Sequence, residues 1–389
     1  MTGVAGPAGP GRVRPDVTRP VAEPHMETTM PFELKRLLTD VFHTEPGEIV
    51  LVACDLPHGD LADLATWRDR RAMAAEWRAA FVELGASGGF ETRPLLSYPA
   101  TGANGADLPA RGTVEGRGVS MDEQLLGCTL AVFLTEFSAT AALDAYCRRK
   151  EDFRAASLPG LERRMEDSAL TADYGEVARR CRILDQCLQD ADRLEVAFST
   201  GQRCTFDLRW RRAEVDDGYL PRFKPGDRII NLPSGETFVV PYEGEKPGEP
   251  SRTAGELPVS LEGERVVLTV RENRIRQVEG AGPGAAELRA FFAADPARSN
   301  IAEVAFGCND QAVVTGNVLE DEKAGFHWAY GRSDHLGGVV GVKAFLAPGN
   351  VVHQDIVYAK GSPIQIAAAV VIGPAGRREV IRDGAYVVF

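Results

Sequence analysis

The sequence lacks several features that would assign it to a class at once. It has no C-x-x-C pair, and its seven cysteines are scattered and odd in number, which argues against a disulfide framework or a structural zinc knot. No run of about 18 apolar residues is present, so no transmembrane helix is expected. Lysine and arginine total 44 against 56 acidic residues, and the resulting charge of −12 disfavours nucleic-acid or anionic-membrane binding. The simplest interpretation is a cytoplasmic protein with free thiols.

Residues 1–30 have little with which to build a core. They are rich in Gly and Pro and lack the apolar stretch of a signal peptide, so a disordered tail is expected there. Between residues 31 and 195, apolar runs such as GEIVLVACD alternate with helical patterns such as ATWRDRRAMAAEWRAAFVELGA and SATAALDAYCRRKEDFRAA. This alternation predicts an N-terminal α/β domain with a mainly parallel sheet.

The pattern changes near residue 195. The segment LEVAFSTGQRCTFDLRWR predicts two strands joined at Thr200–Gly201, and further strand patterns follow with only one clear helix, AAELRAFFAAD. We therefore expect a β-rich α+β domain over residues 196–389. The polar residues that suggest chemistry also lie in this half, so we expect it to be the metal-binding catalytic domain.

Histidine is scarce, with six residues in all, and three of them fall between positions 327 and 353. In VVHQDIVY, His353 and Asp355 are two residues apart, which places both side chains on one face of a strand. Glu303 stands in the apolar stretch IAEVAF, His327 stands among aromatic residues in FHWAY, and Glu236 enters a strand from a turn. Polar groups in such core-like strands need compensation, because an unpaired buried charge is costly.

A metal site is one source of that compensation. Carboxylates and imidazoles together suit Zn²⁺, Co²⁺, Mn²⁺ or Fe²⁺. A close pair of cations needs a bridging group, usually a carboxylate, and such a pair can bind hydroxide and polarise a carbonyl. A metal-free, hydrogen-bonded His353–Asp355 pair explains the same residues, and both interpretations remain open at this point.

Ordered motifs in the C-terminal half resemble the M29 family of metallo-aminopeptidases, of the aminopeptidase T type. The motifs are NLPSGETFVVP, the block NIAEVAFGCNDQAVVTGNVLEDEKAGFHWAYG and the strand VVHQDIVY. The resemblance implies a homodimer that removes N-terminal residues from peptides or small amides, with two divalent cations (Zn, Co or Mn). The metal ligands that it implies are Glu236, Glu303, His327, His353 and Asp355, with Glu303 shared by both metals. Glu322 would be a further ligand, or else a solvated loop charge.

The resemblance also implies catalytic groups. Glu303 would orient the attacking water and relay its proton. The family has a catalytic tyrosine seven residues after the first histidine of the block, but this chain has Asp334 there. An ionised aspartate cannot stabilise an oxyanion, so His335 or Tyr330 would have to supply the missing donor.

Two alternatives accompany this hypothesis. A second branch of the same fold is a mononuclear Fe(II) dioxygenase that cleaves dihydroxypyridine; it shares the H-x-D strand but has a histidine where Glu303 stands, which completes a two-histidine, one-carboxylate triad. The carboxylate-rich set of this chain favours two metals and hydrolysis. The other alternative is a non-catalytic descendant that keeps the fold without turnover.

Overall fold

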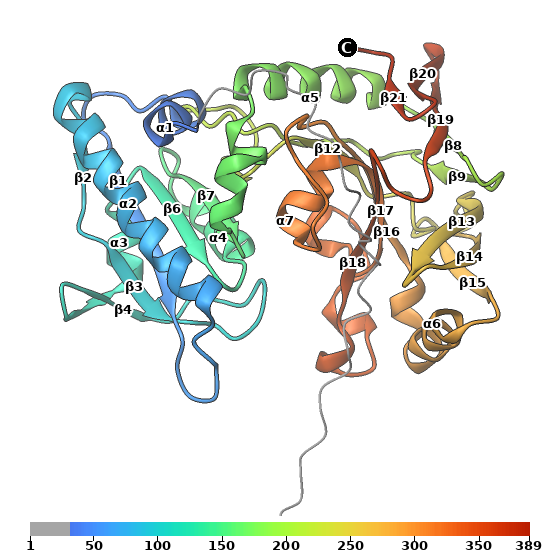
Figure 1. The fold of residues 1–389 in the computed structure, drawn as a ribbon, viewed down its shortest axis with the longest axis horizontal. Coiled ribbons are helices and arrows are strands. Elements are labelled where there is room, and N and C mark those ends of the chain that lie inside the picture. Colours follow the sequence, from blue (N-terminus) through green and yellow to red (C-terminus); the bar gives the residue numbers. More distant parts are fainter. Residues whose placement is uncertain (1–31) are drawn as a thin grey trace, which may run out of the picture.

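The computed structural model describes residues 32–389, so the tail expected at residues 1–30 lies outside the described residues. Two lobes stand side by side in Figure 1. The first, blue to green, is built around one sheet; the second, yellow to red, is built around two more. Helix α5 (Tyr174–Leu188) connects them along the top of the view.

The first lobe contains an eight-stranded sheet with the order β11-β7-β6-β1-β3-β4-β5, and β2 pairs with β1. Strands β1, β2, β3, β6, β7 and β11 pair in parallel, while β3, β4 and β5 form an antiparallel edge. The strands are β1 (Ile49–Leu56), β2 (Glu91–Thr92), β3 (Leu96–Pro99), β4 (Arg111–Val114), β5 (Arg117–Ser120), β6 (Leu130–Thr135), β7 (Arg154–Pro159) and β11 (Ile229–Asn231).

Helices cover both faces of this sheet, as the unbroken apolar strands predict. Alternate residues of β1 enter two different cores: Val50 and Val52 pack with α1 and α2, whereas Leu51 and Ala53 pack with α3 and α4. The helices are α1 (Leu34–Phe42), α2 (Ala65–Gly88), α3 (Met121–Leu126) and α4 (Thr140–Arg149). The expectation of a mainly parallel α/β arrangement in this half therefore agrees with the structure.

The structure confirms only the first part of one predicted helix. The helix predicted over residues 138–156 ends at Arg149, and its last residues belong to the buried strand β7. The polar residues Lys150 to Asp152 separate the two elements, and the apolar run that follows fits a strand covered on both faces. Two short 3₁₀ turns, Arg163–Asp167 and Ala169–Thr171, then lead into α5.

The second lobe contains a five-stranded antiparallel sheet and an eight-stranded antiparallel sheet. The five-stranded sheet, ordered β10-β12-β16-β17-β18, consists of β10 (Glu214–Asp216), β12 (Glu236–Val239), β16 (Ile301–Gly307), β17 (Gly325–Gly331) and β18 (His353–Ala359). The other sheet consists of β15 (Arg274–Glu279), β14 (Glu264–Arg271), β13 (Ala254–Leu261), β9 (Arg203–Asp207), β8 (Arg193–Phe198), β19 (Ile366–Gly373), β20 (Gly376–Arg382) and β21 (Ala385–Tyr386). The hairpin predicted at Thr200–Gly201 is confirmed as β8–β9.

These two sheets share one hydrophobic core. Trp328, Tyr330 and Phe306 of the five-stranded sheet pack in the same buried cluster as strands β8, β13, β14 and β19. Helix α6 (Pro283–Ala294) adds Leu288 to this core, whereas the short helix α7 (Val318–Asp321) and a 3₁₀ turn, Glu322–Ala324, lie against the other face. Further 3₁₀ turns cover Pro296–Ser299, Asp334–Leu336, Val342–Ala344 and Pro348–Asn350. Within residues 32–389, no helix has the length and apolarity needed to span a bilayer.

Candidate metal centre

Four strands of the five-stranded sheet carry polar side chains on the face opposite the hydrophobic core. Strand pairing sets Ala329 of β17 between Glu303 and Asp355, and sets His327 beside Ala305. His353 pairs with Gly331, and Glu236 pairs with Gly307. Each large polar side chain therefore has small neighbours on the adjoining strand, which leaves room for these groups to approach one another on one face.

The five ligands that the resemblance implied lie together on this face. Donor atoms of Glu236, Glu303 and His327 lie within 4.8 Å of one another; we call this set the His327 trio. Donor atoms of Glu303, His353 and Asp355 form a second set within the same distance, the His353 trio. Glu303 belongs to both: its Oε1 lies 3.7 Å from His327 Nε2, and its Oε2 lies 3.0 Å from His353 Nε2.

Backbone contacts orient both imidazoles toward the trios. His327 Nδ1 lies 3.2 Å from the carbonyl oxygen of Gly325, and His353 Nδ1 lies 2.8 Å from that of Arg332. A carbonyl only accepts hydrogen bonds, so each Nδ1 carries a proton. Burial lowers the pKa of both imidazoles, but the neighbouring carboxylates outweigh it and hold both pKa values well above the usual range. Nε2 of each ring then faces the carboxylates, and a cation bound there would take the place of the Nε2 proton, as in metal-binding histidines.

Buried atoms without hydrogen bonds mark the same place. His327 Nε2 and Glu236 Oε2 lie 3.2 Å apart, yet neither atom makes a hydrogen bond, because their alignment does not suit one. Orphaned polar atoms of this kind are costly inside a protein. A divalent cation between the two would satisfy both, so these side chains fit a metal ion.

The charge of the site points the same way. Among the described residues, six carboxylates surround it together with the ammonium of Lys323, so with both imidazoles neutral and all carboxylates ionised, six minus one leaves an excess of five negative charges. The six are Glu214, Asp216, Glu236, Glu303, Glu322 and Asp355. Burial alone would raise the pKa of Glu303, but His327 and His353 lower it to about 2. Two divalent cations would offset most of the excess.

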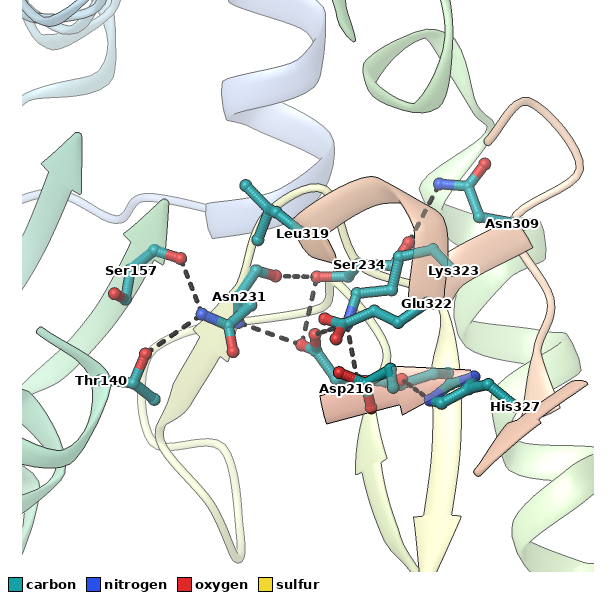
Figure 2. Close-up of polar contacts among 12 residues, drawn as sticks. Thr140, Ser157, Asp216, Asn231, Ser234, Asn309, Leu319, Glu322, Lys323 and His327 are labelled. Atoms are coloured by element: carbon teal, nitrogen blue, oxygen red, sulfur yellow. Dashed lines mark hydrogen bonds and ion pairs between the residues drawn. The ribbon is translucent and has the colours of Figure 1, made fainter. Parts of the chain in front are cut away.

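Lys323 is a fully buried ammonium beside the trios, and sequence reasoning missed it. Its Nζ lies 2.5 Å from Glu236 Oε1. It also lies 2.6 Å from Glu322 Oε1 and 3.2 Å from Asp216 Oδ2, and both of these residues are labelled beside it in Figure 2. Gly307 makes this approach possible, because a Cβ there would lie 2.6 Å from the carbonyl carbon of Lys323. The absence of a side chain at Gly307 thus lets the 3₁₀ turn that carries Lys323 rest on the polar face.

Asp216 links this network to the first lobe. Its Oδ1 accepts hydrogen bonds from the backbone N–H of Asn231 and from the hydroxyl of Ser234, each at 3.2 Å. The Asn231 side chain in turn donates to Thr140 Oγ1 at 3.1 Å and to the Ser157 carbonyl at 3.0 Å (Figure 2). Burial raises the pKa of Asp216 to about 6, against the opposing effect of Lys323.

The remaining expected site residues are placed differently. The Glu322 carboxylate faces Lys323 and belongs to neither trio. Asp334, in the 3₁₀ turn beyond β17, forms an ion pair in which its Oδ1 lies 2.5 Å from Arg332 Nε. The ring centroids of His335 and His353 lie 5.0 Å apart, with the rings edge to face. Burial, helped by the charges of His353 and Arg332, lowers the pKa of His335 to about 4. The His335 ring is therefore neutral near pH 7.

The structure does not bring Tyr330 to the site. Its ring packs against Phe291 and Phe292 in the hydrophobic core, on the opposite face of the sheet from His327. Residues three apart in a strand point to opposite faces. Tyr330 therefore cannot supply the hydrogen-bond donor that the resemblance suggested, whereas the His335 ring lies against the His353 ring.

Glu214 on β10 is a second residue that sequence reasoning missed. Burial, together with the charges of Asp227, Glu303 and Asp144, raises its pKa from 4.5 to about 7. Its sequence context, RRAEVDDGY, is a mixture of charges that looks like a solvated loop. Only the pairing of β10 with β12 reveals that Glu214 shares a sheet with the trios.

This shift predicts a pH-dependent effect of Glu214→Gln in metal-free protein. Between pH 4.5 and 7 the folded state binds more protons at this carboxyl than the unfolded chain, so wild-type stability falls as the pH rises through that window. Glutamine has no charge to bury. We therefore expect the melting temperature of the variant, relative to wild type, to increase from pH 5 to pH 8. Differential scanning calorimetry measures this, with exposed Glu256→Gln as control; a difference that stays constant with pH would contradict the assignment.

Comparisons with known proteins identify related folds, and they do not identify the reaction. No protein-family model matches the sequence, and no curated protein matches it. Among solved structures, the fold is shared with enzymes. One is 2,5-dihydroxypyridine dioxygenase from Pseudomonas putida KT2440, with a TM-score of 0.60 and 16% identity over 91% of this chain and 96% of that one. Another is wild-type AmpT from Thermus thermophilus, with a TM-score of 0.53 and 15% identity over 91% of this chain and 98% of that one. At such identities the likeness shows a related fold, and it does not make this chain a member of the M29 family.

Proposed function

We propose that the protein is a metal-dependent hydrolase that cleaves the amide bond of a peptide or small amide. The observation that carries this proposal is the position of Glu303, whose two carboxylate oxygens face separate trios on one surface of a sheet. A carboxylate shared in this way suits two cations held close together, and AmpT, an M29 aminopeptidase, has a related fold.

The residues would divide the work as follows. Glu236, Glu303, His327, His353 and Asp355 would hold the two divalent cations. Cations bound there would supply an activated water and polarise the scissile carbonyl. Glu303, with one oxygen toward each cation, would hold the two cations together, and a carboxyl outside the trios, for which Glu214 with its pKa of about 7 is the candidate, would accept a proton from the attacking water and return it to the leaving amine. His335, neutral and adjacent to His353, would donate a hydrogen bond to the developing oxyanion in place of the family tyrosine.

Exposure indicates the side from which substrate would arrive. The His353 side chain is 21% exposed, whereas that of His327 is 1% exposed. Substrate would therefore meet the His353 trio first, near His335 and Glu214. Asp144 of α4 and Asp227 contribute further negative charge there, because both raise the pKa of Glu214. A substrate with a free amino group suits this surface, since its ammonium would be attracted to these acids.

The proposal predicts that activity follows metal content. We expect full-length protein stripped with chelator to be inactive, and Zn²⁺, Co²⁺ or Mn²⁺ to restore hydrolysis of at least one substrate in a panel of aminoacyl p-nitroanilides and dipeptides. Metal analysis of each preparation provides the stoichiometry. A protein that binds these metals, but cleaves no member of the panel in any metal form, would contradict the aminopeptidase assignment.

A ring-cleaving dioxygenase is the second candidate, because the fold is also that of 2,5-dihydroxypyridine dioxygenase. The His353 trio has one histidine and two carboxylates, whereas mononuclear Fe(II) oxygenases use two histidines and one carboxylate. Oxygen uptake by the Fe(II)-loaded protein with a dihydroxylated aromatic ring would favour this candidate. Protein that binds no metal and turns over no substrate would instead indicate a non-catalytic descendant.

A further inference from the structure

The two trios differ in the charge that surrounds them. In the His327 trio, Glu236 already has a cationic partner, because Lys323 Nζ lies 2.5 Å from its Oε1. In the His353 trio, Asp355 has no lysine or arginine partner among residues 32–389: its carboxylate lies 3.6 Å from His353 Nε2. One trio therefore offers carboxylates free of any ammonium, and the other offers a carboxylate that an ammonium already holds.

Lys323 is fixed where it lies. The side chain is fully buried and touches three carboxylates, those of Asp216, Glu236 and Glu322. Its backbone carbonyl also accepts a hydrogen bond from the N–H of Asn309 at 3.1 Å. A fully buried ammonium held by three carboxylates cannot swing aside without leaving those carboxylates unpaired when a cation enters. A metal ion in the His327 trio must therefore share Glu236 with a permanent positive charge.

We propose that Lys323 makes the two metal positions unequal, so that the His353 trio fills first and the His327 trio fills only at higher metal concentration. The inference rests on the proposed metal centre and adds an order of filling to it. Repulsion between like charges in a buried setting is strong, so the second position should be weaker by at least ~10-fold. At limiting metal the protein would be mononuclear, and the dinuclear form would require an excess.

The exposure of the two histidines supports the same order. His353 is the more accessible ring, at 21% against 1% for His327. A cation arriving from solvent therefore reaches the His353 trio without passing Lys323. The same lysine also holds one oxygen of Glu236, so that only Oε2 remains for a cation.

The test is a titration of chelator-stripped full-length protein with Co²⁺ alone, followed by calorimetry and by visible absorbance. Wild type should bind one equivalent tightly and a second at least ~10-fold more weakly. Lys323→Met should strengthen the second equivalent by a similar factor and leave the first nearly unchanged. Lys35→Met, which removes an exposed lysine from α1, is the matched control and should leave both affinities unchanged.

A second variant covers the possibility that Lys323→Met does not fold. Glu236→Gln removes a ligand from the His327 trio only, so it should lose the weaker equivalent and keep the tighter one. Loss of the tighter equivalent instead would overturn the inference, as would two equal equivalents in wild type or no strengthening in folded Lys323→Met. If wild type bound two Co²⁺ equivalents with equal affinity and still hydrolysed an amide, this inference alone would be wrong. If wild type bound no metal, the proposed function would be wrong as well.

Discussion

Glu303→Gln is expected to produce the largest loss of activity of any single substitution in the chain. Glutamine keeps the size of the side chain but removes the charge that both trios share. Because the attacking water is activated by the cations, activity should fall with the bound metal, by more than the ~10–100-fold that the loss of an outer partner of a metal ligand costs. Measured kcat and bound metal should therefore fall together, with both metal equivalents weakened.

A buried carboxylate outside the trios provides the matched control. Glu320 is fully buried, accepts hydrogen bonds from Arg164 and Ser168, and belongs to neither trio. Glu320→Gln should destabilise the fold to some degree and still bind both metals. If Glu303→Gln retained two tightly bound metals and normal kcat, the assignment of Glu303 as the shared ligand would be wrong.

Arg154→Leu is expected to produce the largest loss of stability. Arg154 is 2% exposed and pairs with fully buried Glu48, and it also donates to the carbonyls of Leu220 at 2.9 Å and Phe42 at 3.1 Å. Removing the guanidinium leaves the buried Glu48 carboxylate with Arg222, 3.9 Å away, as its remaining cationic neighbour, and breaking a buried pair costs about 3–5 kcal/mol in comparable cases. Urea denaturation should show a clearly lower midpoint than wild type.

A second substitution distinguishes the cost of leaving Glu48 without Arg154 from the cost of losing the ion pair as a whole. Glu48→Leu combined with Arg154→Leu removes both charges, so the double variant should be more stable than Arg154→Leu alone. Arg149, whose partner Asp122 lies on the surface, is the control, and Arg149→Leu should change the midpoint little. Equal midpoints for the Arg154 and Arg149 variants would show that the buried pair has no special role.

The residues of the two trios could be picked out in the sequence because strands make isolated polar positions visible. Glu303, His327 and Asp355 interrupt apolar runs, and an isolated polar residue in such a run is visible in the sequence alone. The offset between His353 and Asp355 also fixes their common face. The same parity argument excludes Tyr330, since it lies three residues after His327 and must face the core.

The surroundings of the ligands could not be anticipated in this way. Lys323 stands in the run LEDEKAG, where a buried lysine is indistinguishable from solvated loop charge until Gly307 brings its turn onto the sheet. Glu214 and Asp216 lie on a three-residue strand, too short to show any periodicity. The sequence did not predict β7, because its first residues continue the apolar spacing of the preceding helix. Burial in the sheet overrides that helical preference.

The strand β11 determines how far the two halves of the molecule can be treated as separate parts. It follows β10 of the second lobe in the chain, yet it pairs in parallel with β7 at the edge of the first sheet. A gene fragment that ends at the compositional change near residue 195 would lack β11. The backbone N–H and C=O groups along that edge of β7 would then be unpaired, and an exposed strand edge of this kind promotes aggregation. Neither half is a portable module, and grafting or shuffling experiments would need to carry residues 229–231 together with the first sheet.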